Sequence, residues 1–135
     1  MLRALRFWGP VVAWMALIFF ASARPLPGPA QAVPDWIPHV AAYGVLGVLM
    51  ARALAAGRGV LGIREMLLAA ALSTLYGVSD EVHQAFVPER TPDIRDAAND
   101  LVGSAAGAVL FRQLLLLRAL VGGGQAGDDP RKDRG

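Results

Sequence analysis

The stretch Val40-Ala-Ala-Tyr-Gly-Val-Leu-Gly-Val-Leu-Met50 decides the fold, because its only polar side-chain atom is the Tyr43 hydroxyl. A second stretch, Met66-Leu-Leu-Ala-Ala-Ala-Leu72, has no polar side chain at all. A surface helix of a soluble bundle needs a polar stripe, and both stretches lack one. A helix that is apolar all round is buried in a large core or in lipid, and 135 residues are too few for such a core. The two stretches therefore favour membrane-spanning helices over a soluble four-helix bundle.

The composition agrees with this interpretation. Hydrophobic residues make up 55% of the chain and charged residues 18%, against about 45–50% and about 25% in soluble domains. Such a chain is neither a disordered segment nor a nucleic-acid-binding tail. It contains no cysteine, which excludes disulfide scaffolds, thiolate metal sites and thiol nucleophiles.

Four apolar segments predict an all-α fold, an integral membrane four-helix bundle with helices at about residues 7–23, 39–56, 65–86 and 96–121. A membrane span needs about 20 mostly apolar residues, and only the first segment provides them without polar interruption. The other three qualify where their polar residues lie at helix ends or face one another. The Gly- and charge-rich segment 122–135 predicts a disordered cytoplasmic tail.

The basic residues are distributed unevenly between the two ends of these helices. With four spans, one side of the membrane receives ten of the thirteen Lys and Arg residues, namely Arg3, Arg6, Arg52, Arg58, Arg64, Arg112, Arg118, Arg131, Lys132 and Arg134. The other side keeps Arg24, Arg90 and Arg95. The positive-inside rule then places the N- and C-termini in the cytoplasm. The positive charge thus indicates orientation, and no nucleic-acid partner is expected.

The N-terminus also admits a second interpretation. Arg3 and Arg6, the apolar run and Ala21-Ser-Ala23 fit a secretory signal peptide with a small-residue cleavage site. The run is long for such a peptide, and Arg24-Pro25 disfavours cleavage. We favour an uncleaved first helix, and both alternatives leave the remaining helices in the same orientation.

Polar side chains gather near one end of the predicted helices. His39 and Tyr43 are four residues apart and share a helix face. On the third segment one arc holds Tyr76, Asp80, His83 and Gln84, with Glu81 turned partly away. On the fourth segment one stripe holds Asp96, Asn99, Asp100, Gly103 and Gly107. The loop that carries Arg90 joins these two groups.

Structural explanations account for some of these residues. Gly103 and Gly107 have the spacing of closely packed helices, and the two tyrosines fit interfacial aromatic positions. The run Asp80-Glu-Val-His-Gln84 resists such explanations. A charge near the bilayer centre costs about 2.5–3.5 kcal/mol on insertion scales, so it marks a functional site by default.

At these residues the chain resembles the VanZ-like family of membrane proteins, named after a teicoplanin-resistance accessory protein. Asp35, His39 and Tyr43 match the acidic residue, histidine and tyrosine with which members enter the second helix. The strongest match is Tyr-Gly-Val-Ser-Asp-Glu-Val-His-Gln-Ala-Phe-Val-Pro-Glu-Arg at 76–90, followed by Asp-Ala-Ala-Asn-Asp-Leu-Val-Gly-Ser-Ala-Ala-Gly at 96–107. Trp36 departs from the family pattern, since many members have lysine there.

The resemblance implies a four-helix domain over residues 7–121 in the bacterial inner membrane, with its polar site facing outwards. It also implies a relation to enzymes that act on lipid phosphate headgroups, including phosphatidylserine synthases. The substrates it implies are envelope lipids and undecaprenyl-linked peptidoglycan precursors. Antibiotic resistance is the phenotype of one member and is not transferred to this chain.

The leading hypothesis is therefore an enzyme that hydrolyses or transfers a phosphate-linked headgroup. His39 is the expected base, with Asp80 and Glu81 orienting it or acting as the acid, and the Arg90 guanidinium matches phosphate oxygens. The expected substrate-binding residues are Tyr43, Tyr76, Gln84, Arg90, Asp96 and Asn99. No cofactor is expected. A hard divalent cation is a weaker alternative, because no spacing forms a recognised metal loop. Its ligands would be the side-chain oxygens of Asp80, Glu81, Asp96, Asn99 and Asp100.

Two other hypotheses use the same residues. A non-catalytic lipid- or antibiotic-binding protein, with an effect on glycopeptide sensitivity, would use the pocket for affinity alone. A small channel or proton-coupled carrier would use Asp80 and His83, but clustering at one interface disfavours a path across the membrane. The sequence leaves the substrate, the reaction and the oligomeric state open.

Overall fold

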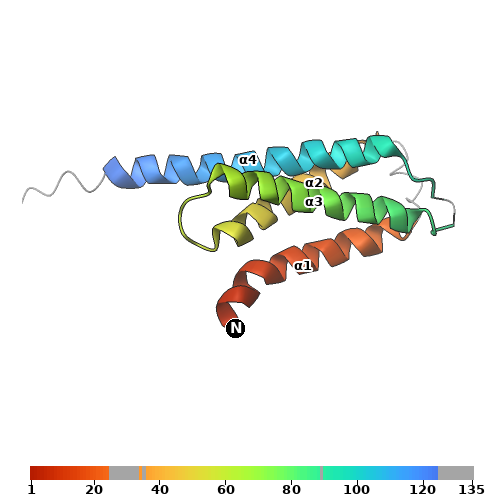
Figure 1. Ribbon diagram of the computed structural model, residues 1–135, viewed down its shortest axis with the longest axis horizontal. Helices are drawn as coiled ribbons and strands as arrows, with labels where there is room; N and C mark the ends of the chain where they lie inside the picture. Colours follow the sequence, from red (N-terminus) through yellow and green to blue (C-terminus); the bar gives the residue numbers. More distant parts are fainter. Residues whose placement is uncertain (25–33, 35, 89, 125–135) are drawn as a thin grey trace, which may run out of the picture.

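In a computed structural model, which describes residues 1–24, 34, 36–88 and 90–124, the described chain is all-helical (Figure 1). Its four helices are α1 (Leu2–Ser22), α2 (Trp36–Ala55), α3 (Ile63–Gln84) and α4 (Ile94–Gly124). The predicted all-α four-helix architecture is confirmed. The segment 122–135 was predicted to be disordered, but α4 continues through residues 122–124, so that part of the prediction is wrong. The rest of this segment and Asp35 lie outside the described residues.

The helices begin earlier than the apolar pattern predicts, by five residues in α1 and by two or three in the others. Hydropathy marks only the part of a helix that suits lipid, whereas helical turns continue into polar sequence. The start of α4 illustrates this: Asp93 is its N-cap, and Asp93 Oδ1 accepts a hydrogen bond of 2.8 Å from the Arg95 amide. At the start of α3 the Glu65 carboxylate accepts a 2.6 Å bond from the Gly62 amide.

The outer surface of the bundle is apolar. Large hydrophobic side chains are exposed on every helix, for example Phe20 at 63%, Leu75 at 64% and Leu117 at 56%. Contiguous exposed apolar surface of this kind is a liability in water and is stable in lipid. Helices α1, α2 and α4 are each long and apolar enough to cross a membrane.

Helix α3 directs four of its polar residues into the bundle. Ser73, Asp80, Glu81 and Gln84 are buried, whereas exposed positions on the same helix carry Leu67, Leu68, Leu75, Val78 and Val82. This distribution is the reverse of that on a surface helix of a soluble protein. It meets the condition that the polar residues of a spanning segment face the other helices.

Helices α2 and α4 pack backbone against backbone. A Cβ atom added at Gly107 would overlap the Gly44 carbonyl, and one at Gly47 would overlap the Ser104 carbonyl. Small residues permit this approach, which is a common mode of helix packing in membranes. The close packing predicted from Gly103 and Gly107 is confirmed.

The four helices run alternately up and down, so each end of the bundle collects four helix termini (Figure 1). One end, here called the site end, contains the last turns of α1 and α3 and the first turns of α2 and α4. The opposite end contains the α2–α3 connection, where Gly57 and Gly59 have φ of 74° and 76°, a conformation that glycine adopts without strain. The arginines of this opposite end are Arg3, Arg6, Arg52, Arg58, Arg64, Arg112 and Arg118.

The α2–α4 contact predicts a selective effect of one methyl group. Gly107→Ala should lower the free energy of unfolding by about 1–3 kcal/mol, because the added Cβ meets backbone that cannot move aside. Gly122→Ala on the same helix is the matched control, since a Cβ there meets nothing within 4 Å. Reversible SDS unfolding in mixed micelles measures both variants. Equal stabilities of the two variants would contradict the packing.

Candidate functional site

A cavity of about 700 Å³ opens at the site end of the bundle. Its apolar wall includes Trp14, Leu17 and Ile18 of α1. Its polar lining includes seven of the nine residues predicted from sequence, namely His39, Tyr43, Asp80, Gln84, Arg90, Asp96 and Asn99. The polar residues that are far apart in the sequence therefore meet in one place.

His39 lies between two carboxylates of α4. Its Nδ1 is 2.9 Å from Asp100 Oδ1, and its Nε2 is 3.5 Å from Asp96 Oδ2. The Asp100 side chain is 1% exposed, whereas those of His39 and Asp96 are 17% and 19% exposed. A carboxylate can only accept, so Nδ1 donates its proton to Asp100. The imidazole is thus oriented with Nε2 toward the more accessible side.

The sequence analysis placed Asp100 on the polar stripe and among the candidate cation oxygens, but not among the catalytic or substrate-binding residues. The hypothesis that Asp80 or Glu81 orients His39 is not what the structure shows, because Asp100 makes that contact. The Asp100 carboxylate packs against Gly77 of α3. A residue with a Cβ atom at position 77 would collide with this carboxylate. The four-residue spacing from Asp96 was the available signal, since it puts both acids on one face of α4.

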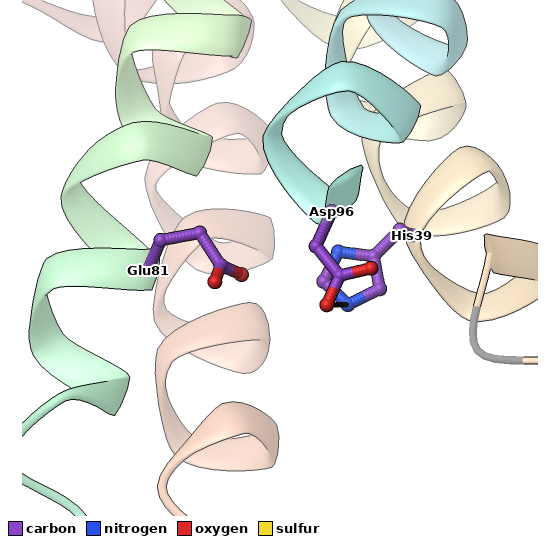
Figure 2. A group of neighbouring side chains, drawn as sticks. All are labelled: His39, Glu81 and Asp96. Carbon is purple, nitrogen blue, oxygen red and sulfur yellow. Dashed lines mark ion pairs between the residues drawn. The ribbon is translucent and has the colours of Figure 1, made fainter. Parts of the chain in front are cut away.

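Glu81 points into the group that contains His39 and Asp96 (Figure 2). One ligand atom of each of the three residues lies within 4.8 Å of the others. Glu81 is 8% exposed, and its Oε2 accepts a 3.1 Å bond from the Asp93 amide. Glu81 therefore belongs to the site, although it turns away from the arc that holds Asp80, as predicted. Consecutive helical residues point about 100° apart, so α3 directs Asp80 toward α1 and Glu81 toward α4.

Asp80 is held by two neighbours. Its Oδ1 accepts a 2.7 Å bond from Ser22 Oγ at the end of α1, and its Oδ2 accepts a 3.2 Å bond from Gln84 Nε2. Gln84 Nε2 also donates to Glu81 Oε1 at 3.3 Å. The amide of Gln84 thus links the two buried carboxylates, and Ser22, which the sequence analysis did not assign to the site, joins α1 to it.

The two predicted tyrosines differ in role. The Tyr76 hydroxyl donates a 2.6 Å bond to the Met15 carbonyl, so it fastens α3 to α1, and Tyr76 is absent from the cavity lining. Tyr43 lines the cavity one turn from His39 and is 2% exposed. Its hydroxyl has no hydrogen-bond partner among the described residues.

Arg90 brings positive charge to the cavity from the α3–α4 connection. One terminal nitrogen donates to the Arg24 carbonyl at 3.1 Å. Its buried Nε has no partner within the described part of the chain. His83, by contrast, stacks on Phe19 with ring centroids 4.2 Å apart and does not line the cavity. Asp80 lines the cavity and His83 does not, so the structure gives no support to a carrier that uses both residues.

Comparison with known families identifies the class of protein. The VanZ/LLP1 family matches residues 7–118, most of the chain. The chain belongs to this family. No curated protein sequence and no solved structure matches it significantly.

The segments that resemble the VanZ-like pattern are those that line the cavity. His39 and Tyr43 come from the first segment, Asp80 and Gln84 from the second, and Asp96 from the third. Trp36, where many VanZ-like members carry lysine, also lines the cavity and is 54% exposed. In this member Arg90 and Arg95 carry the positive charge of the lining.

The bond between Ser22 and Asp80 predicts a measurable coupling. Ser22→Ala should lower the free energy of unfolding by about 1–2 kcal/mol, because a buried carboxylate loses a donor. Ser79→Ala is the control, since Ser79 is exposed and its hydroxyl donates only to the Tyr76 carbonyl. A double-mutant cycle with Asp80→Asn isolates the pair. No difference between the two serine variants would show that the bond contributes nothing.

Proposed function

We propose that this membrane protein binds the phosphate-linked headgroup of an envelope lipid or of a lipid-linked cell-wall precursor, and hydrolyses or transfers it. The observation that carries the proposal is that one cavity, at the end of a lipid-exposed bundle, contains both the Arg90 guanidinium and the oriented His39 imidazole. The first group suits phosphate, and the second suits the transfer of a proton.

Binding of the phosphate is assigned to Arg90. Its planar guanidinium offers donors in the geometry that phosphate oxygens accept, and its Nε donor has no partner among the described residues. Because the Arg24 carbonyl holds one terminal nitrogen, the remaining donors are pre-oriented. Arg95 at the cavity rim adds a second positive charge.

The apolar wall suits a lipid rather than a free phosphate ester. Trp14, Leu17 and Ile18 of α1 line the same cavity as Arg90. The first segment of a lipid chain would contact these residues while its phosphate reaches the polar side. A soluble metabolite would gain little from them.

Activation of the acceptor is assigned to His39. Asp100 holds the Nδ1–H, so Nε2 faces the acceptor with its lone pair and takes the proton of a water or hydroxyl. The oxygen so formed attacks phosphorus, and the bond from phosphorus to the leaving oxygen breaks. The acid that returns a proton to that oxygen is assigned to Asp80 or Glu81.

We also infer that the site end faces outward from the bacterial inner membrane, with both termini in the cytoplasm. Seven of the described arginines lie at the opposite end, as named above, whereas Arg24, Arg90 and Arg95 lie at the site end. Short segments with an excess of Lys and Arg stay on the cytoplasmic side. The headgroup substrate would then be in the outer leaflet.

The proposed reaction predicts a loss of turnover in single variants. Purified protein in vesicles that contain candidate phospholipids or undecaprenyl-linked lipids should release headgroup, as followed by mass spectrometry. His39→Gln and Arg90→Ala should each reduce release by about 10²–10⁴-fold, since each removes one catalytic or binding group.

Arg64→Ala is the control for these variants, because it removes the same charge at the exposed opposite end and should keep full turnover. Stoichiometric lipid or glycopeptide binding without product would contradict an enzyme and support the non-catalytic binding protein.

The orientation predicts a labelling pattern, and a chain without cysteine makes the experiment simple. Thr91→Cys at the site end should react with a membrane-impermeant maleimide in intact cells. Val60→Cys, which is 66% exposed in the α2–α3 connection, should react only after the cells are permeabilised. The reverse pattern would invert the topology.

A further inference from the structure

We infer that the site holds a divalent transition-metal ion, such as Mn²⁺ or Zn²⁺, with His39, Glu81 and Asp96 as its ligands. One nitrogen and two carboxylate oxygens lie within 4.8 Å of one another. They come from α2, α3 and α4 and converge on the same space (Figure 2). Ligand atoms about 2.1 Å from one ion lie about 3–4.2 Å apart, so the three side chains would have to move closer together as the ion binds.

The contact between His39 and Asp100 is the second observation. In metal sites a ligating histidine almost always donates its other ring N–H to a carboxylate or carbonyl, which fixes the tautomer and raises the basicity of the ligand. Asp100 accepts from Nδ1 at 2.9 Å and is 1% exposed. The Nε2 atom is left 3.5 Å from Asp96 Oδ2, which is longer than an ordinary hydrogen bond. A shared cation explains this spacing of two electron-pair donors.

The Tyr43 hydroxyl is a further polar group of the same cavity that has no partner among the described residues. It is buried in the cavity wall one turn from His39, and no described residue bonds to it. A buried hydroxyl without a partner costs about 1–3 kcal/mol. A water molecule or hydroxide on the metal ion would accept its hydrogen bond.

The balance of charge also favours a cation when an anion binds. Arg90 and Arg95 are the basic residues of the cavity lining. The carboxylates that line or adjoin the cavity are Asp80, Glu81, Asp93, Asp96 and Asp100. A phosphate group would be repelled by this excess of acids. A divalent ion between Glu81 and Asp96 offsets their charge and offers coordination positions to phosphate oxygens and water.

The ligand types select the ion. Imidazole binds Zn²⁺ and related transition-metal ions well, and carboxylates also bind Mn²⁺. Ca²⁺ and Mg²⁺ prefer sites made of oxygen ligands alone. The inference rests on the proposed function for its phosphate substrate. It also changes one step of that function: Nε2 of His39 becomes a ligand, and the ion-bound water, which loses its proton more readily, becomes the attacking oxygen.

The test measures metal binding directly. Full-length protein in lipid nanodiscs is stripped with a chelator and titrated with Mn²⁺, and free Mn²⁺ is followed by electron paramagnetic resonance. One equivalent should bind. Glu81→Gln and Asp96→Asn should each weaken binding by about 100-fold or more, and Asp100→Asn by about 10–100-fold, because it acts through His39.

Asp93→Asn is the matched control, since it removes a carboxylate from the same cavity but keeps the backbone amide that bonds Glu81. It should bind Mn²⁺ as the unaltered protein does, and circular dichroism checks that every variant is folded. Absence of stoichiometric binding of both Mn²⁺ and Zn²⁺, or equal affinity of Glu81→Gln and Asp93→Asn, would overturn the metal site.

Headgroup release separates this inference from the proposed function. If stripped protein binds no metal yet releases headgroup, the metal site is wrong and the proposed function stands. If the protein binds one metal ion but releases no headgroup from any lipid, the metal site stands and the proposed reaction is wrong.

Discussion

The rest of the site depends on the backbone contact between α2 and α4. Gly44 and Gly47 on one helix and Gly103 and Gly107 on the other leave no side chain between the two backbones. On α2 this contact includes the Val40 backbone, which follows His39 directly, and on α4 it includes Gly103, three residues after Asp100. The close approach therefore places the two side chains within hydrogen-bond distance. A larger residue in this contact would move the imidazole away from its carboxylate partner.

The membrane imposes the second constraint. The insertion of a carboxylate into lipid costs free energy. The structure reduces this cost because the carboxylates lie at the site end and have polar partners. Ser22 and Gln84 bond to Asp80, while the Asp93 amide bonds to Glu81. Helix α3 consequently buries Ser73, Asp80, Glu81 and Gln84 and exposes most of its leucines and valines. These polar residues lower the mean hydropathy of α3, whereas α1, α2 and α4 are each apolar enough over their length to cross a membrane.

Much of the site could be predicted from helical spacing within single segments. Seven of the nine predicted residues line one cavity, because residues three or four apart on a helix share a face whatever the neighbouring helix is. The sequence could not show which carboxylate contacts His39, since that depends on how α2, α3 and α4 are rotated about their axes. For this reason the contact between His39 and Asp100 was not predicted, and Asp80 or Glu81 was expected in the place of Asp100. Tyr76 was assigned to the site because the sequence does not show what a tyrosine hydroxyl contacts. In the structure this hydroxyl donates to the Met15 carbonyl and does not face the cavity.

The sequence by itself determined the helical class, the number of helices and the small residues of the α2–α4 contact. Each of these follows from local composition, since a stretch such as 40–50 has no polar stripe and Gly103 and Gly107 share one helix face. Only the tertiary structure decided which polar groups pair: Asp100 with His39, Ser22 with Asp80, and Glu81 with the space between His39 and Asp96. Those pairings join residues from different helices, and their geometry is set by how closely the helices approach and how each is rotated, which no single segment encodes.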